Sequence, residues 1–392
     1  MNLEETVEDR LFREEARTWL AENAPRTPRP HETLAAREYD AQMQRKLYDG
    51  GWAGVNWPEA YGGRGLSGFR YLIWLEECAR APTPVSDGAN YTGLFHAGPT
   101  LIVRANEAQK SFHLPRILRG EAMWCQGFSE PGAGTDLAAL RCKGEIDGDH
   151  VVVTGHKTWT SNGHFADYQE LLVRTDPDSK RHHGLTWLIC DMHLPGIEVR
   201  PIKTMGGESE VNDTFYEGVR IPIANVVGQV GEGWSVAMST FAFERGIGFI
   251  RNQIEVAEQL EQLIAIAGRT RLSNGRFAIK DDAIAQSLAF LKAEVLALRA
   301  MTISGLAYIE RHGQPGPEGS MMKVLITTVY KKLHQVAADI LGPQFLEYAG
   351  EKNSNPWTYR YLWSWVLTIA GGSNEIQRDV IADRILGLPR AR

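Results

Sequence analysis

A carboxylate and a guanidinium follow an apolar stripe in the segment WSVAMSTFAFERG, which has the periodicity of a helix. Trp234, Met238 and Phe241 share one face of this predicted helix. Glu244 and Arg245 come three and four residues after Phe241, so we expect both side chains to point toward the interior. A buried carboxyl group has a raised pKa, which suits a general base. The alternative is a structural Glu-Arg pair whose members satisfy each other.

The segment FSEPGAGTD, residues 128–136, combines Pro and two Gly with small hydroxyl residues. Such a loop lets backbone amides approach a ligand closely. A plain hairpin connection would have the same composition, so the loop alone does not decide between the two. It lacks the GxGxxG spacing and the following helix of a dinucleotide fingerprint.

A second segment, GHKTWTSNGHFADY, places Trp159 directly before Thr160, Ser161 and Asn162 at the end of a predicted strand. A large flat ring beside hydroxyl groups suits an isoalloxazine ring, which stacks on one side and forms hydrogen bonds at its edge. The alternative is a tryptophan that fills the core of the sheet.

Near the C-terminus, Gly371, Gly372 and Ser373 precede an apolar-striped helix. Glycines that lead into a helix N-terminus present free amides and the positive end of the helix dipole, which suit a pyrophosphate or a thioester oxygen. An ordinary N-cap by Ser373 explains the same residues.

The hydrophobic pattern changes twice along the chain. Helical periodicity holds to about residue 121, short β-branched and aromatic runs follow to about 227, and helical periodicity then returns. We therefore predict a helical domain at 1–121, an antiparallel β-domain at 122–230 and a helical domain at 231–392. The strongest helical segments of the last part are 234–268, 279–311, 319–341 and 373–387.

Composition narrows the class of protein. The 392 residues are 43% hydrophobic and 23% charged, which is typical of a folded chain with more than one domain. A formal charge of -6 gives no general attraction for nucleic acid or anionic membranes. The four cysteines form no CxxC pair, so neither a metal site nor a disulfide framework is predicted. The N-terminus is unlike a secretory signal and no run approaches the roughly 18 apolar residues of a membrane span, so we expect a cytoplasmic protein.

Taken in order, GGWAGVNWPEAYGGRGLS, FSEPGAGTD, KTWTSNG and GGSNEIQRDVIADRILGLPR resemble the signature segments of the acyl-CoA dehydrogenase family. The resemblance covers essentially the whole chain. It implies an α+β, mainly α fold, with an N-terminal helical domain, a middle antiparallel β-barrel-like domain and a C-terminal four-helix bundle. It also implies a bound FAD, an acyl-CoA substrate and an electron-transferring flavoprotein as electron acceptor.

The resemblance further assigns binding residues. Thr135 would lie near the CoA portion, and Arg245 would contribute to the substrate pocket. A homo-oligomer is implied, because the family's counterparts of Arg271 and Ser273 contact the FAD of a neighbouring subunit. Asp339 replaces a family Gln, which weakens that one contact. The residues implied to contact the cofactor are Phe128, Ser129, Trp159, Ser161, Arg271, Ser273, Ser373 and Glu375.

The catalytic position departs from the commonest family pattern. Many members carry the base directly before the C-terminal signature, where this chain has Gly371. A second group keeps its base within a Glu-Arg pair on the helix that opens the bundle, where Glu244 and Arg245 stand. The resemblance thus implies that Glu244 removes the α-proton while the backbone N–H of Gly371 and the FAD ribose hydroxyl polarise the thioester carbonyl.

Three other functions remain open at this point. An acyl-CoA oxidase or a flavin monooxygenase on the same scaffold would let oxygen reach the reduced flavin. A non-catalytic subunit of a hetero-oligomer would bind no flavin by itself. A nicotinamide-dependent dehydrogenase fits poorly, because the chain lacks alternating strands and helices.

Overall fold

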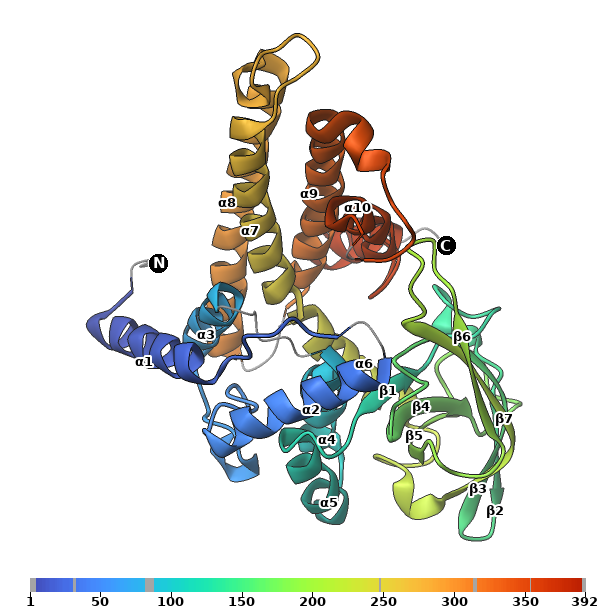
Figure 1. The fold of residues 1–392 in the computed structure, drawn as a ribbon. Coiled ribbons are helices and arrows are strands. Elements are labelled where there is room, and N and C mark those ends of the chain that lie inside the picture. The colour runs from blue at the N-terminus through green and yellow to red at the C-terminus, as the bar shows by residue number, and fades with distance from the viewer. Residues whose placement is uncertain are drawn as a thin grey trace. The chain divides into compact units, whose positions relative to one another are not determined.

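The computed structural model falls into two compact units, coloured along the chain in Figure 1. The first contains residues 5–203 and 209–244, and the second contains residues 204–208 and 245–392. The predicted domain limits at 121 and 230 stay predictions. The structure describes residues 5–30, 33–81, 88–246, 248–312, 316–352 and 354–389.

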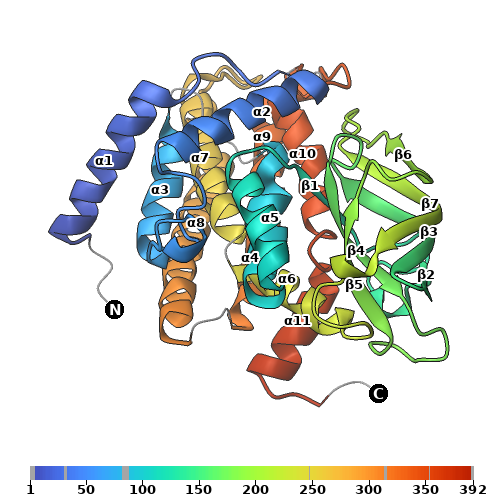
Figure 2. The same cartoon turned by 90° about the horizontal axis from the view of Figure 1, so that it is seen from below.

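Helices form the N-terminal part of the first unit, as the periodicity predicted. Phe12, Ala16 and Leu20 recur at four-residue spacing and form the buried face of α1, which packs against α3. Figure 2 shows these two helices side by side, with α4 next to α5. The helices of this part are α1 Val7–Asn23, α2 Thr33–Asp49, α3 Gly68–Arg80, α4 Gly98–Arg104 and α5 Glu107–Leu118.

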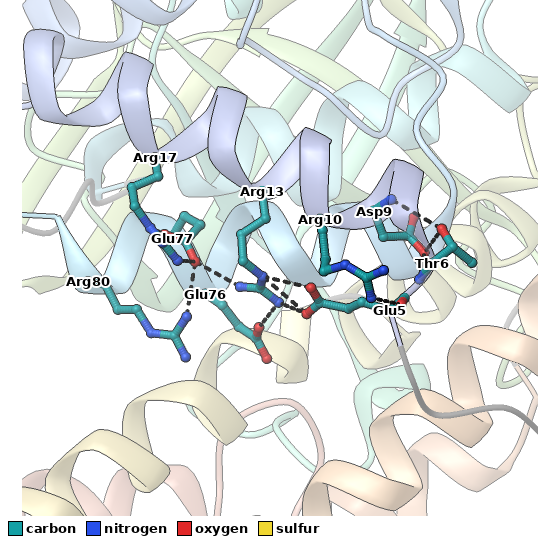
Figure 3. A network of polar contacts seen from close by, with 9 residues as sticks. All are labelled: Glu5, Thr6, Asp9, Arg10, Arg13, Arg17, Glu76, Glu77 and Arg80. Carbon is teal, nitrogen blue, oxygen red and sulfur yellow. Dashed lines mark hydrogen bonds and ion pairs between the residues drawn. The ribbon is translucent and has the colours of Figure 1, made fainter.

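An ionic network joins α1 to α3 (Figure 3). Arg13 contacts Glu76 and Glu77 at 2.8 Å each, and Arg17 Nε lies 2.8 Å from Glu77 Oε2. The Glu77 side chain is only 1% exposed. Burial alone would raise the pKa of Glu77, but hydrogen bonds from Arg17 and Arg13 hold it below its ordinary value. The two arginines therefore stabilise the buried carboxylate of Glu77 and, with it, the contact between α1 and α3.

A curled sheet completes the first unit (Figure 1). The strand order is β1-β4-β2-β3-β7-β6, and β5 pairs with β4. The neighbours are antiparallel except that β4 runs parallel to β1 and to one residue of β2. A parallel pair needs a long crossover connection, which the β2–β3 hairpin provides between β1 and β4. The strands are β1 Trp124–Gly127, β2 Lys143–Asp147, β3 His150–Ser161, β4 Tyr168–Arg174, β5 Leu185–Asp191, β6 Ile197–Ile202 and β7 Val211–Pro222.

The second unit is a bundle in which α7, α8, α9 and α10 pack around one apolar core. Leu260, Leu298 and Leu333 are fully buried in that core. The four-helix bundle confirms the predicted fold class, although α10 was not predicted from the sequence. The helices are α7 Gly248–Arg269, α8 Asp282–His312, α9 Glu318–Leu341, α10 Pro356–Leu367 and α11 Asn374–Val380.

Two predicted helices differ from the structure at their ends. In place of the single helix predicted over 234–268, the structure has two helices, α6 Gly233–Gly246 and α7 Gly248–Arg269. Ile247, between them, lies outside the described residues. Glycines at both ends of this interruption weaken a helix. The last predicted helix, 373–387, is the shorter α11 followed by a π-helical turn over Ile381–Ile385.

Within the described ranges, no helix is long and apolar enough to cross a membrane. No cluster of three His, Cys, Asp or Glu side chains in the same ranges could hold a metal ion. The four cysteines are buried as free thiols, and burial raises the pKa of Cys142 to about 11.

Candidate active site

The loop that follows β1 is anchored from below by a buried lysine. Lys157 Nζ donates to the carbonyl of Phe128 at 2.9 Å and to Glu130 Oε1 at 2.8 Å. The carbonyl of Ser129 accepts the backbone N–H of Thr158 at 2.9 Å. The N–H of Ser129 donates to no acceptor among the described residues. The loop thus turns its carbonyls toward the sheet and keeps at least one N–H available for a ligand.

Trp159 does not fill the core of the sheet. Its side chain is 61% exposed, and its φ of 59° lies in the left-handed region that a bulky residue rarely adopts. The β3–β7 register shifts between Lys157 and Thr160, so a bulge turns this residue out of the strand pattern. Ser161 is exposed on the same strand. The exposure of Trp159 excludes the alternative of a core tryptophan, and backbone strain of this kind is typical of ligand sites.

The face of α6 that packs into the core is not the apolar stripe predicted from the sequence. Val236, Ala237 and Thr240 are its fully buried residues. The predicted stripe of Trp234, Met238 and Phe241 is only half-buried, as is Glu244. Sequence periodicity could not separate these two faces, because both contain apolar residues.

The half-buried face of α6 meets the loop after β1. The ring of Phe241 contacts that of Phe128 edge-to-face, with centroids 5.7 Å apart. Glu244 follows Phe241 by less than one helical turn. Phe128, Phe241 and Glu244 are therefore on the same side of the first unit. The side chain of Arg245 lies outside the described residues.

A buried polar cluster that the sequence analysis missed lies near Glu244. Glu170 is fully buried on β4, and its Oε1 lies 3.6 Å from His96 Nδ1. Gln126 Nε2 lies 3.4 Å from the same Oε1 and 3.5 Å from His96 Nδ1. Burial lowers the pKa of His96, but the contact with Glu170 and the charge of Glu244 outweigh it, so that this pKa is raised. A signal existed in the strand YQELLVR, whose acid stands within an otherwise buried run.

The second unit contains the predicted glycine pair in a turn with left-handed backbone. Gly371 and Gly372 have φ of 66° and 89°, values that glycine adopts readily. Lys323 Nζ donates to the carbonyl of Gly372 at 2.7 Å, and Gln377 Nε2 donates to that of Gly371 at 2.9 Å. The N–H of Gly371 has no acceptor among the described residues. Both carbonyls thus accept hydrogen bonds from side chains, and the N–H of Gly371 is available to a ligand.

Ser373 caps α11, because its side chain accepts the N–H of Ile376 at 3.4 Å. The N-cap interpretation of this residue is therefore confirmed, and it leaves the ligand interpretation of the preceding glycines open. Glu375 and Asp339 are exposed.

Arg271 and Ser273 lie in the exposed turn between α7 and α8. Arg271 Nη1 donates to the carbonyl of Gly275 at 2.7 Å, and its guanidinium stacks 4.2 Å from the Phe277 ring centroid. These contacts hold the arginine at the surface of the second unit.

The predicted residues thus divide between the two units. Phe128, Ser129, Thr135, Trp159, Ser161 and Glu244 belong to the first. Arg271, Ser273, Gly371, Ser373 and Glu375 belong to the second. Thr135 is exposed on the loop after β1.

Helices, a curled sheet and a helical bundle in this order define the architecture of a class of oxidoreductases that act on acyl thioesters. The chain belongs to the acyl-CoA dehydrogenase family, because it matches that family's N-terminal domain at residues 6–121, its middle domain at 125–217 and its C-terminal domain at 231–386. It is therefore an enzyme of that family.

Several relatives are similar over their full length. Acyl-CoA dehydrogenase IpdE1 of Mycobacterium tuberculosis is 39% identical over 389 residues, covering 97% of each chain. Acyl-CoA dehydrogenase FadE26 of the same organism is 33% identical and covers 100% of both. Among solved structures, the ChsE4-ChsE5 complex from Mycobacterium tuberculosis has a TM-score of 0.84 at 32% identity, with 100% of each chain covered. The Tcur3481-Tcur3483 steroid ACAD has a TM-score of 0.85 at 29% identity, also over 100% of each chain.

Proposed function

We propose that this enzyme removes hydrogen from the α- and β-carbons of an acyl-CoA thioester to give the trans-2-enoyl-CoA, with Glu244 as the base. One observation carries the proposal: Glu244 is half-buried on α6, on the side where Phe241 contacts the loop of Phe128. At the position where many family members carry the base, Gly371 has no side chain.

The residues present fit an FAD. The outward ring of Trp159, the exposed Ser161 and the available N–H of Ser129 would face a flat ring with acceptors at its edge. When bound, FAD supplies the acceptor of the β-hydride. The remaining cofactor contacts that we propose are those of Phe128, Ser373 and Glu375 and, toward the cofactor of a second subunit, Arg271 and Ser273.

The reaction requires two functional groups from this chain. A carboxylate must take the α-proton, and we assign this to Glu244. A donor must face the thioester oxygen, on which negative charge develops, and we assign this to the N–H of Gly371. The carbonyls of Gly371 and Gly372 are held by Gln377 and Lys323, which keeps the turn in one conformation before substrate arrives. Thr135 and Arg245 are proposed substrate contacts.

For the acyl group we propose a bulky or ring-bearing chain. One similar solved structure is that of a steroid ACAD, and the absent side chain at Gly371 leaves more room than an acid would. An electron-transferring flavoprotein is the proposed electron acceptor. The proposed assembly is an oligomer, either of identical chains or with a second related subunit, since two similar structures are named as pairs.

Flavin bleaching under anaerobic conditions tests the function. Purified protein with bound FAD is mixed with a panel of straight, branched and ring-bearing acyl-CoA thioesters, and the loss of flavin absorbance is followed. Glu244→Gln should keep the yellow flavin and lose bleaching, whereas Glu232→Gln, a change in an acid ahead of α6, should behave as wild type. Bleaching by the Glu244→Gln variant at the wild-type rate would overturn the assignment of the base.

The same preparation separates the alternatives. Reoxidation within seconds on admitting air would favour an acyl-CoA oxidase or monooxygenase. A chain that binds no FAD when purified alone, but does so with a coexpressed second subunit, would favour a hetero-oligomer.

A further inference from the structure

Helices α4 and α6 are joined by three hydrogen bonds that show their relative direction. Thr100 Oγ1 and Thr240 Oγ1 lie 2.9 Å apart, and both residues are fully buried. Arg104 Nε donates to Ser239 Oγ at 2.9 Å and Arg104 Nη2 to the carbonyl of Ser235 at 3.4 Å. Later residues of one helix thus contact earlier residues of the other, so the two helices are antiparallel.

The same geometry brings a histidine to the candidate base. His96 precedes Thr100 by four residues, and Glu244 follows Thr240 by four, so each lies about one turn along the face that carries the threonine contact. His96 belongs to the π-helical turn Gly93–Ala97, which continues directly into α4. Such turns are frequent at functional sites. Burial raises the pKa of Glu170, and the charge of Glu244 raises it further; the same charge raises the pKa of His96, as expected for neighbours.

Glu170 contacts this histidine from the sheet, and Gln126 Nε2 donates to the same carboxylate oxygen at 3.4 Å. The two residues are paired in the parallel register of β1 and β4, so their side chains lie on one face of the sheet. His96 Nε2 and Glu170 Oε2 are buried and have no hydrogen-bond partner among the described residues. A buried ionic cluster with incomplete hydrogen bonding costs stability, which is typical of a functional requirement.

We propose that His96 and Glu170, whose Nδ1 and Oε1 atoms are in direct contact at 3.6 Å, are positioning residues that keep the candidate base Glu244 in its carboxylate form. The inference rests on the proposed role of Glu244. The imidazolium of His96 provides the positive charge, and Glu170 keeps the imidazole protonated in a buried environment. The titratable groups that face His96 are Glu170 from β4, Glu244 from α6 and the ring of Tyr91, whose centroid is 5.2 Å away.

The sign of the effect follows from charge alone. A neutral side chain at 96 removes the cation that favours ionised Glu244, so the base needs a higher pH to lose its proton. The bleaching rate should fall at low pH, and we call this fall the acidic limb of its pH profile. His96→Gln should therefore shift this limb toward higher pH. A shift of about one pH unit corresponds to a rate about tenfold lower well below that limb, with little change on the alkaline plateau.

A second variant, Glu170→Gln, tests whether the effect of His96 depends on Glu170. Without its carboxylate partner, buried His96 loses the contact that raises its pKa and becomes neutral. Adding His96→Gln to a Glu170→Gln protein should then move the limb no further, whereas the same change in the wild type should move it to higher pH. A purely structural pair would lower melting temperature and rate at every pH and leave the limb in place.

The experiment is anaerobic single-turnover flavin bleaching from pH 5 to 9, with melting temperature and flavin content measured for each variant. The inference is overturned if His96→Gln leaves the limb unmoved, or moves it equally in the wild type and in the Glu170→Gln protein. If His96→Gln does not fold, His96→Asn, which also removes the cation, takes its place with the same outcomes. Failure of the proposed function looks different: the wild type would not bleach, or Glu244→Gln would bleach with an unchanged limb.

Discussion

Lys157 and Glu130 form a buried ion pair beneath the loop after β1, with Nζ and Oε1 2.8 Å apart. Lys157 is fully buried, and the other oxygen of Glu130 accepts the backbone N–H of Arg141 at 2.7 Å. One lysine thus holds both the carbonyl of Phe128 and the acid of the FSEPG segment. The shape of this loop depends on a residue that lies beneath it, within the sheet.

Replacement of Lys157 should strongly destabilise the protein. Lys157→Met leaves the Glu130 carboxylate without its cation and should lower the free energy of unfolding by about 3–5 kcal/mol, with loss of bound flavin. Lys143→Gln, in the exposed Lys143–Glu145 pair, should change it by less than about 1 kcal/mol. Chemical denaturation and flavin absorbance measure both effects. Equal stability of the two variants would contradict the role of the buried pair.

Trp159 should show opposite effects on stability and on cofactor binding. Trp159→Gly relieves the strain of a φ of 59° and removes little buried surface, so the flavin-free protein should be as stable as wild type or more stable by about 1 kcal/mol. Affinity for FAD should fall, because the outward ring is lost. Thermal unfolding without flavin and fluorescence titration with FAD measure the two. A Trp159→Gly protein that binds FAD as tightly as the wild type would refute the stacking role, and Trp159→Phe is the control that keeps a ring.

Acid should weaken the contact between α1 and α3. The pKa of Glu77 is held below its unfolded value, so its stabilising contribution is present above the unfolded pKa and is lost as pH falls through the folded pKa. Glu77→Gln should therefore lower the melting temperature at pH 7 and have a much smaller effect near pH 3. Thermal scans across this range test the sign. A penalty that stays constant down to pH 3 would mean that the charge of Glu77 is not what stabilises the contact.

The glycine turn before α11 should resist a side chain. Gly371→Ala keeps the backbone N–H but places a Cβ at a φ of 66°, which should destabilise the protein by about 1 kcal/mol and slow bleaching. Gly268→Ala, within α7 and with open space around the new Cβ, should instead stabilise by about 0.5–1 kcal/mol. Denaturation midpoints give the comparison. Equal gains from both substitutions would show that a side chain at 371 meets no backbone strain.

The sequence by itself determined the order of helices, sheet and helices, because hydrophobic periodicity is set by the geometry of each element. The strands β1 to β7 lie within residues 122–230, where β-branched and aromatic runs predicted a β-domain. Its signature segments also sufficed to identify the family and to single out Glu244.

Only the tertiary structure decided the features that depend on residues distant in sequence. The parallel pairing of β1 with β4, the outward turn of Trp159 at a bulge and the helix α10 follow from packing against neighbouring elements, which local periodicity does not record. His96 and Glu170 are 74 positions apart along the chain, and neither belongs to a motif. They meet because a π-helical turn and a strand pack together, and burial then makes their charges matter to Glu244.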